Sequence, residues 1–316
     1  MGVENDQSNI SSGYAASPTG TLLAKTLAVF ASDQYRFGDA LMVDMGCRWD
    51  RVDYHYENLS TVWPTLESGT RAFEQLSPAL GLTAYPEGDM SGFANISRAF
   101  KVPPFEDFAV FSPSYNANPK IGPQISDTFE AGIRGKGLVL WQIAGYQSSI
   151  QDEILYNDSL FSNENVDTIH QGASIKVGCD VGLLSLDFNA VLDRGWIVRG
   201  SSGSLLTGRT IPNIPDWVAK VRVNYMWSKC VTSYLQGRFV GENSPLNDYE
   251  GLQKQPGFGV FDAGIKCQLS DWLLSVDIWN VWDARFPEEV AVNWSGALDI
   301  YPAPGRIWTG SFSWSF

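Results

Sequence analysis

The side chains that most often carry out enzyme chemistry are few and scattered in this sequence. It contains two histidines, and a Ser-His-Asp triad or a histidine metal site would require His55, in a predicted loop, and His170, in a predicted strand, to find partners by chance. The glycines of residues 132–137 lack the spacing of a phosphate-binding loop, and the four cysteines include no C-x-x-C pair. We therefore predict no catalytic residue, no enzymatic activity, no metal site and no cofactor.

Aromatic rings and guanidinium groups in the long predicted loops are the side chains best suited to hold a ligand. Guanidinium groups bind anions and rings stack on aromatic groups, so together they suit an anionic chelate with aromatic arms. The candidates are Trp63, Arg71, Tyr115, Arg209, Tyr249 and Trp294. Each has an alternative role, because loop aromatics also pack against one another or sit in the aromatic girdle at a membrane interface. That girdle would claim Trp227, Trp272, Trp308 and Trp314.

The elements that position these loops are best seen in residues 306–316, RIWTGSFSWSF, where large apolar residues alternate with small polar ones. This period is that of a β-strand with rings on one face and hydroxyls on the other. Such a strand can close a membrane barrel, with rings toward lipid and hydroxyls toward a wet lumen. A soluble β-sandwich can end in the same way, so this segment alone leaves both architectures open. The aromatic positions are Trp308, Phe312, Trp314 and Phe316.

The same alternation recurs in hairpins over residues 21–316 and predicts about thirteen strands. The predicted connections alternate between short turns and long loops, as in outer-membrane barrels, whereas sandwiches and propellers have no physical reason to segregate loop lengths. A Lys or Arg facing lipid near the midplane would cost about 2–4 kcal/mol, and the charges inside the strands all lie on the other face. They are Arg48, Arg134, Lys220, Arg222, Lys266 and Asp277. We predict an all-β, antiparallel transmembrane β-barrel, preceded by residues 1–20 as a polar loop or tail.

Composition narrows the class of protein further. Hydrophobic residues make up 44% of the chain and charged residues 18%, a mixture that strands with one lipid-facing and one polar face produce. The net charge of −13 argues against a nucleic-acid partner. No stretch approaches the roughly 20 apolar residues that a membrane-spanning helix needs. An odd number of strands would leave unpaired edges in hydrocarbon, so we expect that the strands which would precede residue 20 in a closed barrel are missing.

Several segments resemble, in order along the chain, the C-terminal part of the β-barrel of TonB-dependent outer-membrane receptors, which import ferric siderophores and similar scarce ligands. Each segment alone is weakly diagnostic, but their collinearity makes a chance match improbable. The segments are AVFASDQ at residues 28–34, GCRWDR at 46–51, LSPALGL at 76–82, NISRAF at 95–100, SDTFEAG at 126–132, HQG at 170–172, WNVWD at 279–283 and YPAPGR at 301–306.

The resemblance implies a protein of the Gram-negative outer membrane that contacts lipid and binds a ferric siderophore or a similar small ligand. It also implies that Trp308, Phe312, Trp314 and Phe316 form the signal read by the outer-membrane assembly machinery. The family's signal peptide, TonB-contacting box and plug are not recognisable, and its barrels have 22 strands. We therefore expect a partial barrel without the plug, which would reach the TonB complex only through a missing N-terminal part.

Two alternatives to a receptor fragment stay open from the sequence: a passive porin-like channel and a non-functional truncated receptor. Both would share the barrel pattern and would differ in what precedes it.

Overall fold

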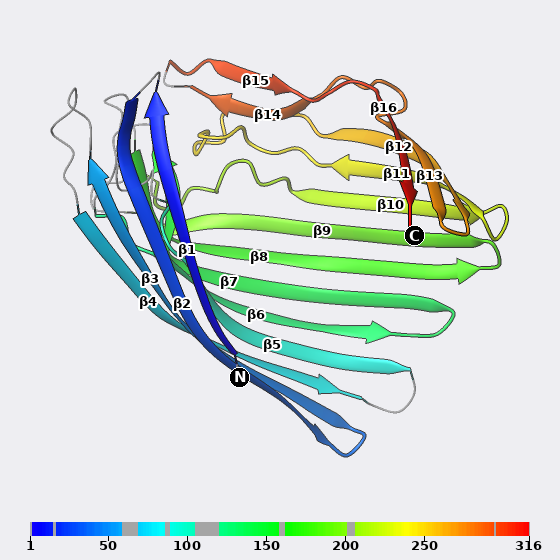
Figure 1. Ribbon diagram of the computed structural model, residues 1–316, viewed down its shortest axis with the longest axis horizontal. Coiled ribbons are helices and arrows are strands. Elements are labelled where there is room, and N and C mark those ends of the chain that lie inside the picture. Colours follow the sequence, from blue (N-terminus) through cyan, green and yellow to red (C-terminus); the bar gives the residue numbers. More distant parts are fainter. Residues whose placement is uncertain are drawn as a thin grey trace.

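The computed structural model describes residues 2–14, 17–58, 69–85, 89–104, 120–157, 162–200, 206–293 and 295–315. Fourteen strands form one antiparallel sheet, in the order β1 to β13 and then β16, while β14 and β15 form a separate hairpin (Figure 1). The strands are β1 Gly2–Tyr14, β2 Ser17–Phe37, β3 Leu41–Asn58, β4 Gly69–Ala84, β5 Met90–Lys101, β6 Gln124–Gly135, β7 Val139–Asn157, β8 Ser162–Val181, β9 Leu184–Arg199, β10 Trp217–Met226, β11 Val231–Val240, β12 Phe258–Leu269, β13 Trp272–Trp279, β14 Pro287–Val292, β15 Leu298–Pro302 and β16 Ile307–Trp314.

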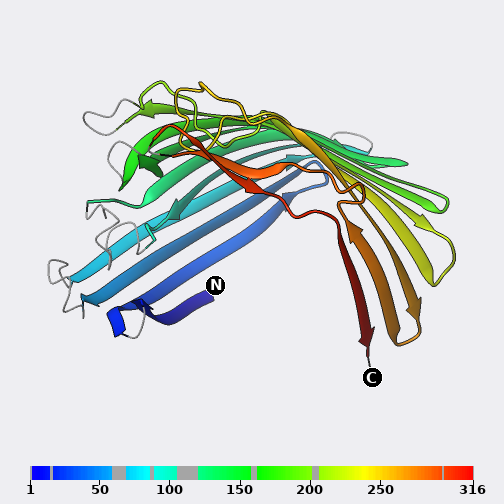
Figure 2. The ribbon, with the colours of Figure 1, turned by 90° about the horizontal axis from the view of Figure 1, so that it is seen from above.

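The large sheet is bent into an open arch, with β1 at one end and β16 at the other (Figure 2). Each strand pairs with its neighbour in sequence up to β13, which pairs with β16 across the β14–β15 hairpin. Among the described residues, none pairs with the outer edge of β1 or of β16. The predicted all-β, antiparallel architecture is confirmed.

The expectation that residues 1–20 form a loop or tail is wrong. The backbone of Gly2–Tyr14 pairs with β2, from Gly2 opposite Phe30 to Tyr14 opposite Ser17. A polar, serine-rich composition hid this strand because the sequence pattern reports side chains, whereas a ladder is made by backbone groups that every residue but proline supplies. The thirteen predicted strands are all present, as β2–β13 and β16.

The two faces of the sheet differ in the way that the alternation predicts. In β4, Leu76, Leu80 and Leu82 are exposed on one face, while Phe73 and Thr83 are buried on the other. Large apolar side chains are exposed in the same way on strand after strand, far beyond the few hundred Å² that a soluble monomer exposes. This apolar face is therefore the one that meets lipid. Within the described part of the chain, no helix is long and apolar enough to cross a membrane.

Aromatic side chains cluster on the apolar face near the ends of the strands. The ring of Trp272 stacks on Trp314 at 5.6 Å and lies 5.0 Å from that of Phe312. Trp227 is 64% exposed and Trp308 63% exposed. Exposed, clustered rings at strand ends are what an interfacial girdle requires. Phe316, the last member of the predicted assembly signal, lies outside the described residues.

Asn280 fastens the outer ends of the last three strands of the sheet. It is 5% exposed; its backbone N–H donates to Asp262 Oδ1 at 2.9 Å, and its side chain exchanges hydrogen bonds of 2.8 and 2.9 Å with the backbone of Ala284. Three residues on, Asp283 accepts a 2.8 Å hydrogen bond from the backbone N–H of Arg306. That bond and the nearby Arg285 guanidinium lower the pKa of the Asp283 carboxyl. The WNVWD segment is thus a structural joint.

We expect Asn280→Ala to destabilise the folded sheet by about 1–3 kcal/mol, because backbone and side-chain partners around a buried amide lose their hydrogen bonds. The measurement is the urea midpoint of the protein in detergent micelles. Asn247→Ala is the matched control, since both asparagines adopt positive φ but Asn247 has one long side-chain bond, 3.4 Å to Val292 O. Equal losses in the two variants would contradict the assignment.

Val276→Arg is expected to reduce folding into lipid vesicles by about 2–4 kcal/mol, because Val276 is 49% exposed on the apolar face. Ser275→Arg, one residue away on the polar face, should be tolerated, since its hydroxyl already lies 3.1 Å from Asp277 Oδ2. The folded fraction is read from heat-modifiable migration in gels. Similar losses for both positions would refute the assignment of the faces.

Candidate functional site

Three of the long connections are bound to one another beyond the ends of the strands. They are residues 200–216 between β9 and β10, 241–257 between β11 and β12, and 280–306 between β13 and β16. The backbone N–H of Asn213 donates to Ser244 O at 2.9 Å, which joins the first connection to the second. Leu246 joins the second to the β14–β15 hairpin, because it donates to Val290 O at 2.8 Å and accepts from Val292 N at 2.9 Å. These connections therefore form one fastened layer.

The middle connection turns tightly around Asp248. This residue is 7% exposed, and its carboxylate accepts hydrogen bonds from the backbone N–H groups of Leu252 at 3.2 Å and Gln253 at 2.7 Å. Asn247 and Gly251 adopt positive φ, which asparagine and glycine tolerate better than other residues. The carboxylate fixes a turn that holds Tyr249 and Glu250 in place.

The first connection folds back along β9 and covers His170. Ile211 donates its backbone N–H to Gly195 O at 3.0 Å. A Cβ on Gly195 would lie 2.8 Å from Ile211 Cδ1 and 3.0 Å from His170 Cε1, so a larger residue here would require these two side chains to shift. His170 Nε2 lies 3.1 Å from Glu153 Oε2, and Thr168 also donates to that carboxylate. The Ile211–Gly195 hydrogen bond holds the connection on β9, whereas the contacts with Glu153 join β8 to β7. His170 therefore has a structural role between two strands.

A cleft of about 390 Å³ lies in the fastened layer and brings together two of the predicted ligand residues, Arg209 and Tyr249. Arg209 Nη2 lies 3.4 Å from Glu250 Oε1, and the Tyr249 hydroxyl donates to Tyr156 O at 2.9 Å. Arg209 keeps 41% of its side chain exposed, so its guanidinium can still meet a ligand. The remaining lining includes Asn157.

The other predicted ligand residues do not join this cleft in the described structure. Arg71 lies on β4, where it donates to Ile121 O at 2.8 Å and stands 5.1 Å over the Phe73 ring. It lines a separate depression of about 550 Å³ together with His55. The last three candidates, Trp63, Tyr115 and Trp294, lie outside the described residues.

The cleft also contains residues that the sequence reasoning missed, namely Asn157, Asp248 and Glu250. The segment Asn247–Gly251 combines Asn, Asp and Gly, which is typical of a turn, and that signal could have placed its carboxylates at a loop tip. Among the described residues, no three His, Cys, Asp or Glu side chains are grouped to hold a metal ion. The cleft presents a guanidinium, a phenol ring, amides and carboxylates to a ligand.

Comparisons with known proteins agree with this architecture. The family model described as TonB-dependent receptor-like β-barrel matches residues 3–281. The vitamin B12 transporter BtuB of Photobacterium profundum is 30% identical over 140 residues, which are 40% of this chain and 22% of that protein.

Two solved structures share the fold. The siderophore receptor PiuA from Acinetobacter baumannii superposes with a TM-score of 0.74 at 16% identity. The match covers 94% of this chain and 44% of the PiuA chain. The ferric yersiniabactin uptake receptor FyuA from Yersinia pestis superposes with a TM-score of 0.72 at 19% identity. That match covers 94% of this chain and 46% of the FyuA chain. The chain thus spans less than half the length of each of these proteins.

Asp248→Ala is expected to raise the rate of trypsin cleavage after Lys254 roughly tenfold, because loss of two hydrogen bonds to a carboxylate makes local opening easier by about 1.4 kcal/mol or more. Glu250→Ala is the control, since its 61% exposed side chain makes only the long contact to Arg209. Cleavage rates are followed by mass spectrometry. A turn that resists trypsin equally in both variants would contradict the role of Asp248.

Proposed function

The chain belongs to the TonB-dependent receptor-like β-barrel family, and on that premise we propose that it forms part of the wall of an importer for a scarce small ligand such as a ferric siderophore. The family consists of transporters and receptors, and its place is the outer membrane of Gram-negative bacteria. The proposed role is binding and passage of a ligand without chemical change, so the chain is not an enzyme.

One observation carries the ligand proposal: the fastened layer brings Arg209 and Tyr249 to one cleft. A guanidinium attracts an anionic chelate, and a phenol ring offers a face for aromatic arms. PiuA and FyuA are named for siderophores and BtuB for vitamin B12, so the family accommodates ligands of several kinds. Trp63, Tyr115, Trp294 and Arg71 stay proposed contacts from neighbouring connections.

The remaining partners follow from the same proposal. The unpaired outer edges of β1 and β16 would need further strands in a bilayer, because exposed ladders cannot persist in hydrocarbon. Energy coupling to the TonB complex would come through parts of the protein beyond this sheet. Trp308, Phe312, Trp314 and Phe316 would be read by the outer-membrane assembly machinery. A passive porin-like channel or an inactive truncated receptor is the competing function.

The test of the ligand proposal is binding of a ferric tris-catecholate siderophore to the chain in detergent micelles, measured by quenching of tryptophan fluorescence. Arg209→Ala should weaken binding about tenfold or more, because a charge-assisted contact contributes roughly 1.5–3 kcal/mol. Arg285→Ala, an exposed arginine of the last connection outside the cleft, should leave the affinity unchanged.

Two outcomes would overturn this proposal. Equal weakening by the two arginine variants would show a general charge effect in place of a site. Absence of binding, together with ligand-independent passage of small sugars through vesicles that contain the protein, would favour the passive channel.

A further inference from the structure

We propose that a row of four cationic side chains on the polar face binds a small polyanionic solute carrying carboxylate or phosphate groups. The four, called here the cationic row, are Arg134 on β6, Lys176 on β8, Lys220 on β10 and Arg238 on β11. The proposal rests on the proposed function in one respect, namely that the polar face of the sheet encloses the lumen.

The register of the ladders places the row on one line across the sheet. Side chains directly opposite each other on neighbouring strands have Cβ atoms about 4.5–5.5 Å apart. Lys220 and Arg238 are opposed in this way, and each of the other cations is separated from the next by one amide-bearing residue on the strand between them. The directly opposed pairs are Ser91–Arg134, Arg134–Gln142, Gln142–Lys176, Lys176–Asn189, Asn189–Lys220 and Lys220–Arg238. The line therefore consists of cations joined by hydroxyl and amide side chains, and it contains no carboxylate.

This arrangement costs stability unless an anion compensates it. Lys220 and Arg238 are directly opposite, and like charges in that position destabilise a sheet. Among the described residues, no member of the row forms an ion pair. Arg134 donates to the Ser91 hydroxyl at 3.1 Å, and Arg238 stands 5.6 Å over the Phe258 ring. Neither contact neutralises a charge.

The nearest carboxylates on the same face belong to the next line toward the turns. There Asp187 is directly opposite Arg222, and Asp262 is directly opposite Gln236, whose amide donates to it at 3.3 Å. The negative charge of Asp187 therefore lies opposite Arg222, a cation outside the cationic row. The row keeps a net positive charge within a protein whose overall charge is −13.

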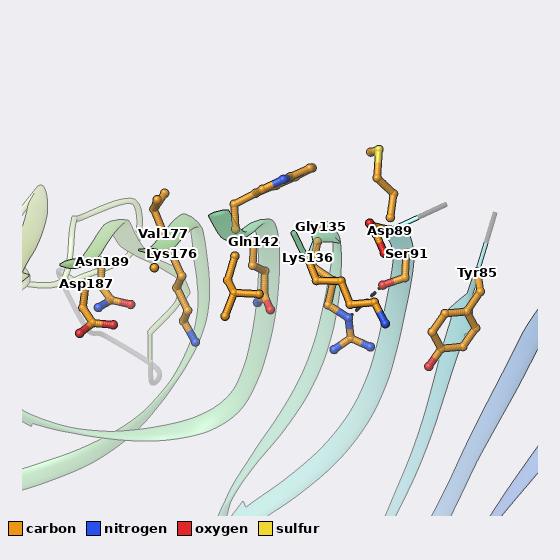
Figure 3. A pocket seen from close by; sticks show the side chains of 15 residues that line it. Tyr85, Asp89, Ser91, Gly135, Lys136, Gln142, Lys176, Val177, Asp187 and Asn189 are labelled. Atoms are coloured by element: carbon orange, nitrogen blue, oxygen red, sulfur yellow. Dashed lines mark hydrogen bonds between the residues drawn. The ribbon is translucent and has the colours of Figure 1, made fainter. Parts of the chain in front are cut away.

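A cavity of about 490 Å³ lies along the β6–β8 part of the row, a size that suits a small ligand. Figure 3 shows Gln142, Lys176 and Asn189 projecting from one side of the strands and Val177 from the other. The lining adds Lys136 near Ser91, and the phenol of Tyr85. It also includes two carboxylates, Asp89 and Asp187, and the apolar side chains of Met90, Leu140, Trp141 and Val177. Ammonium and guanidinium donors among neutral amides and hydroxyls match carboxylate or phosphate oxygens.

The test is isothermal titration of inorganic tripolyphosphate into the full chain in a zwitterionic detergent at low ionic strength. Lys176→Gln with Lys220→Gln should weaken binding at least tenfold and make its salt dependence shallower, because two cations are lost from the site. Lys25→Gln with Lys229→Gln removes the same charge away from the row and is the matched control. Citrate should behave like tripolyphosphate, and uncharged trehalose should not bind.

The outcomes separate a site from diffuse attraction. Equal weakening in row and control variants, or unchanged binding in the row variant, would overturn the proposal. Far-UV circular dichroism and heat-modifiable migration show whether each variant is folded, and the single Lys176→Gln variant gives the test if the double variant is not. If tripolyphosphate binds through the row while siderophore binding fails, the importer proposal alone is refuted.

Discussion

The structure depends on one constraint, which is that backbone N–H and C=O groups in hydrocarbon must be paired within the protein. Between the two outer edges, fourteen strands meet it by pairing in an unbroken series, and the register along each pair is nearly continuous. Once the ladders are fixed, alternate side chains must face opposite sides. The lipid face, the polar face and the placement of every charge on the wall follow from that geometry.

The constraint explains why the sequence was so informative about the wall. Ala219, Val221 and Val223 alternate with Lys220, Arg222 and Asn224 because lipid lies on one side only, and that contrast is visible in the sequence. The strand Gly2–Tyr14 and the β14–β15 hairpin were not predicted. The first is polar in composition, and the second lies among the connections, where no lipid face imposes an alternation. Backbone pairing in such segments is decided by neighbours that are distant in the sequence.

The connections were predictable only as places where ligand residues could lie. Arg209 and Tyr249 meet in one cleft because residues 200–216 fold back on β9 and Asp248 fixes the turn of the next connection. Arg71 has the same chemistry, but its guanidinium is directed to Ile121 O. The residue types alone do not show which of these arginines faces the cleft. The difference arises from hydrogen bonds that the composition does not reveal, some of them to partners distant in the sequence, such as Tyr249 to Tyr156 and Arg71 to Ile121.

The register also limits how such a wall can change in evolution. Because Lys176 and Val177 are adjacent on β8, inserting or deleting one residue between the β8–β9 turn and this point would exchange their faces. The ammonium group would then meet lipid and the valine would meet water, at every position up to the next turn or bulge. Bulges such as the one between Ile150 and Glu153 on β7 can absorb an extra residue. Length variation in this wall is therefore expected in pairs of residues, at bulges or in the connections.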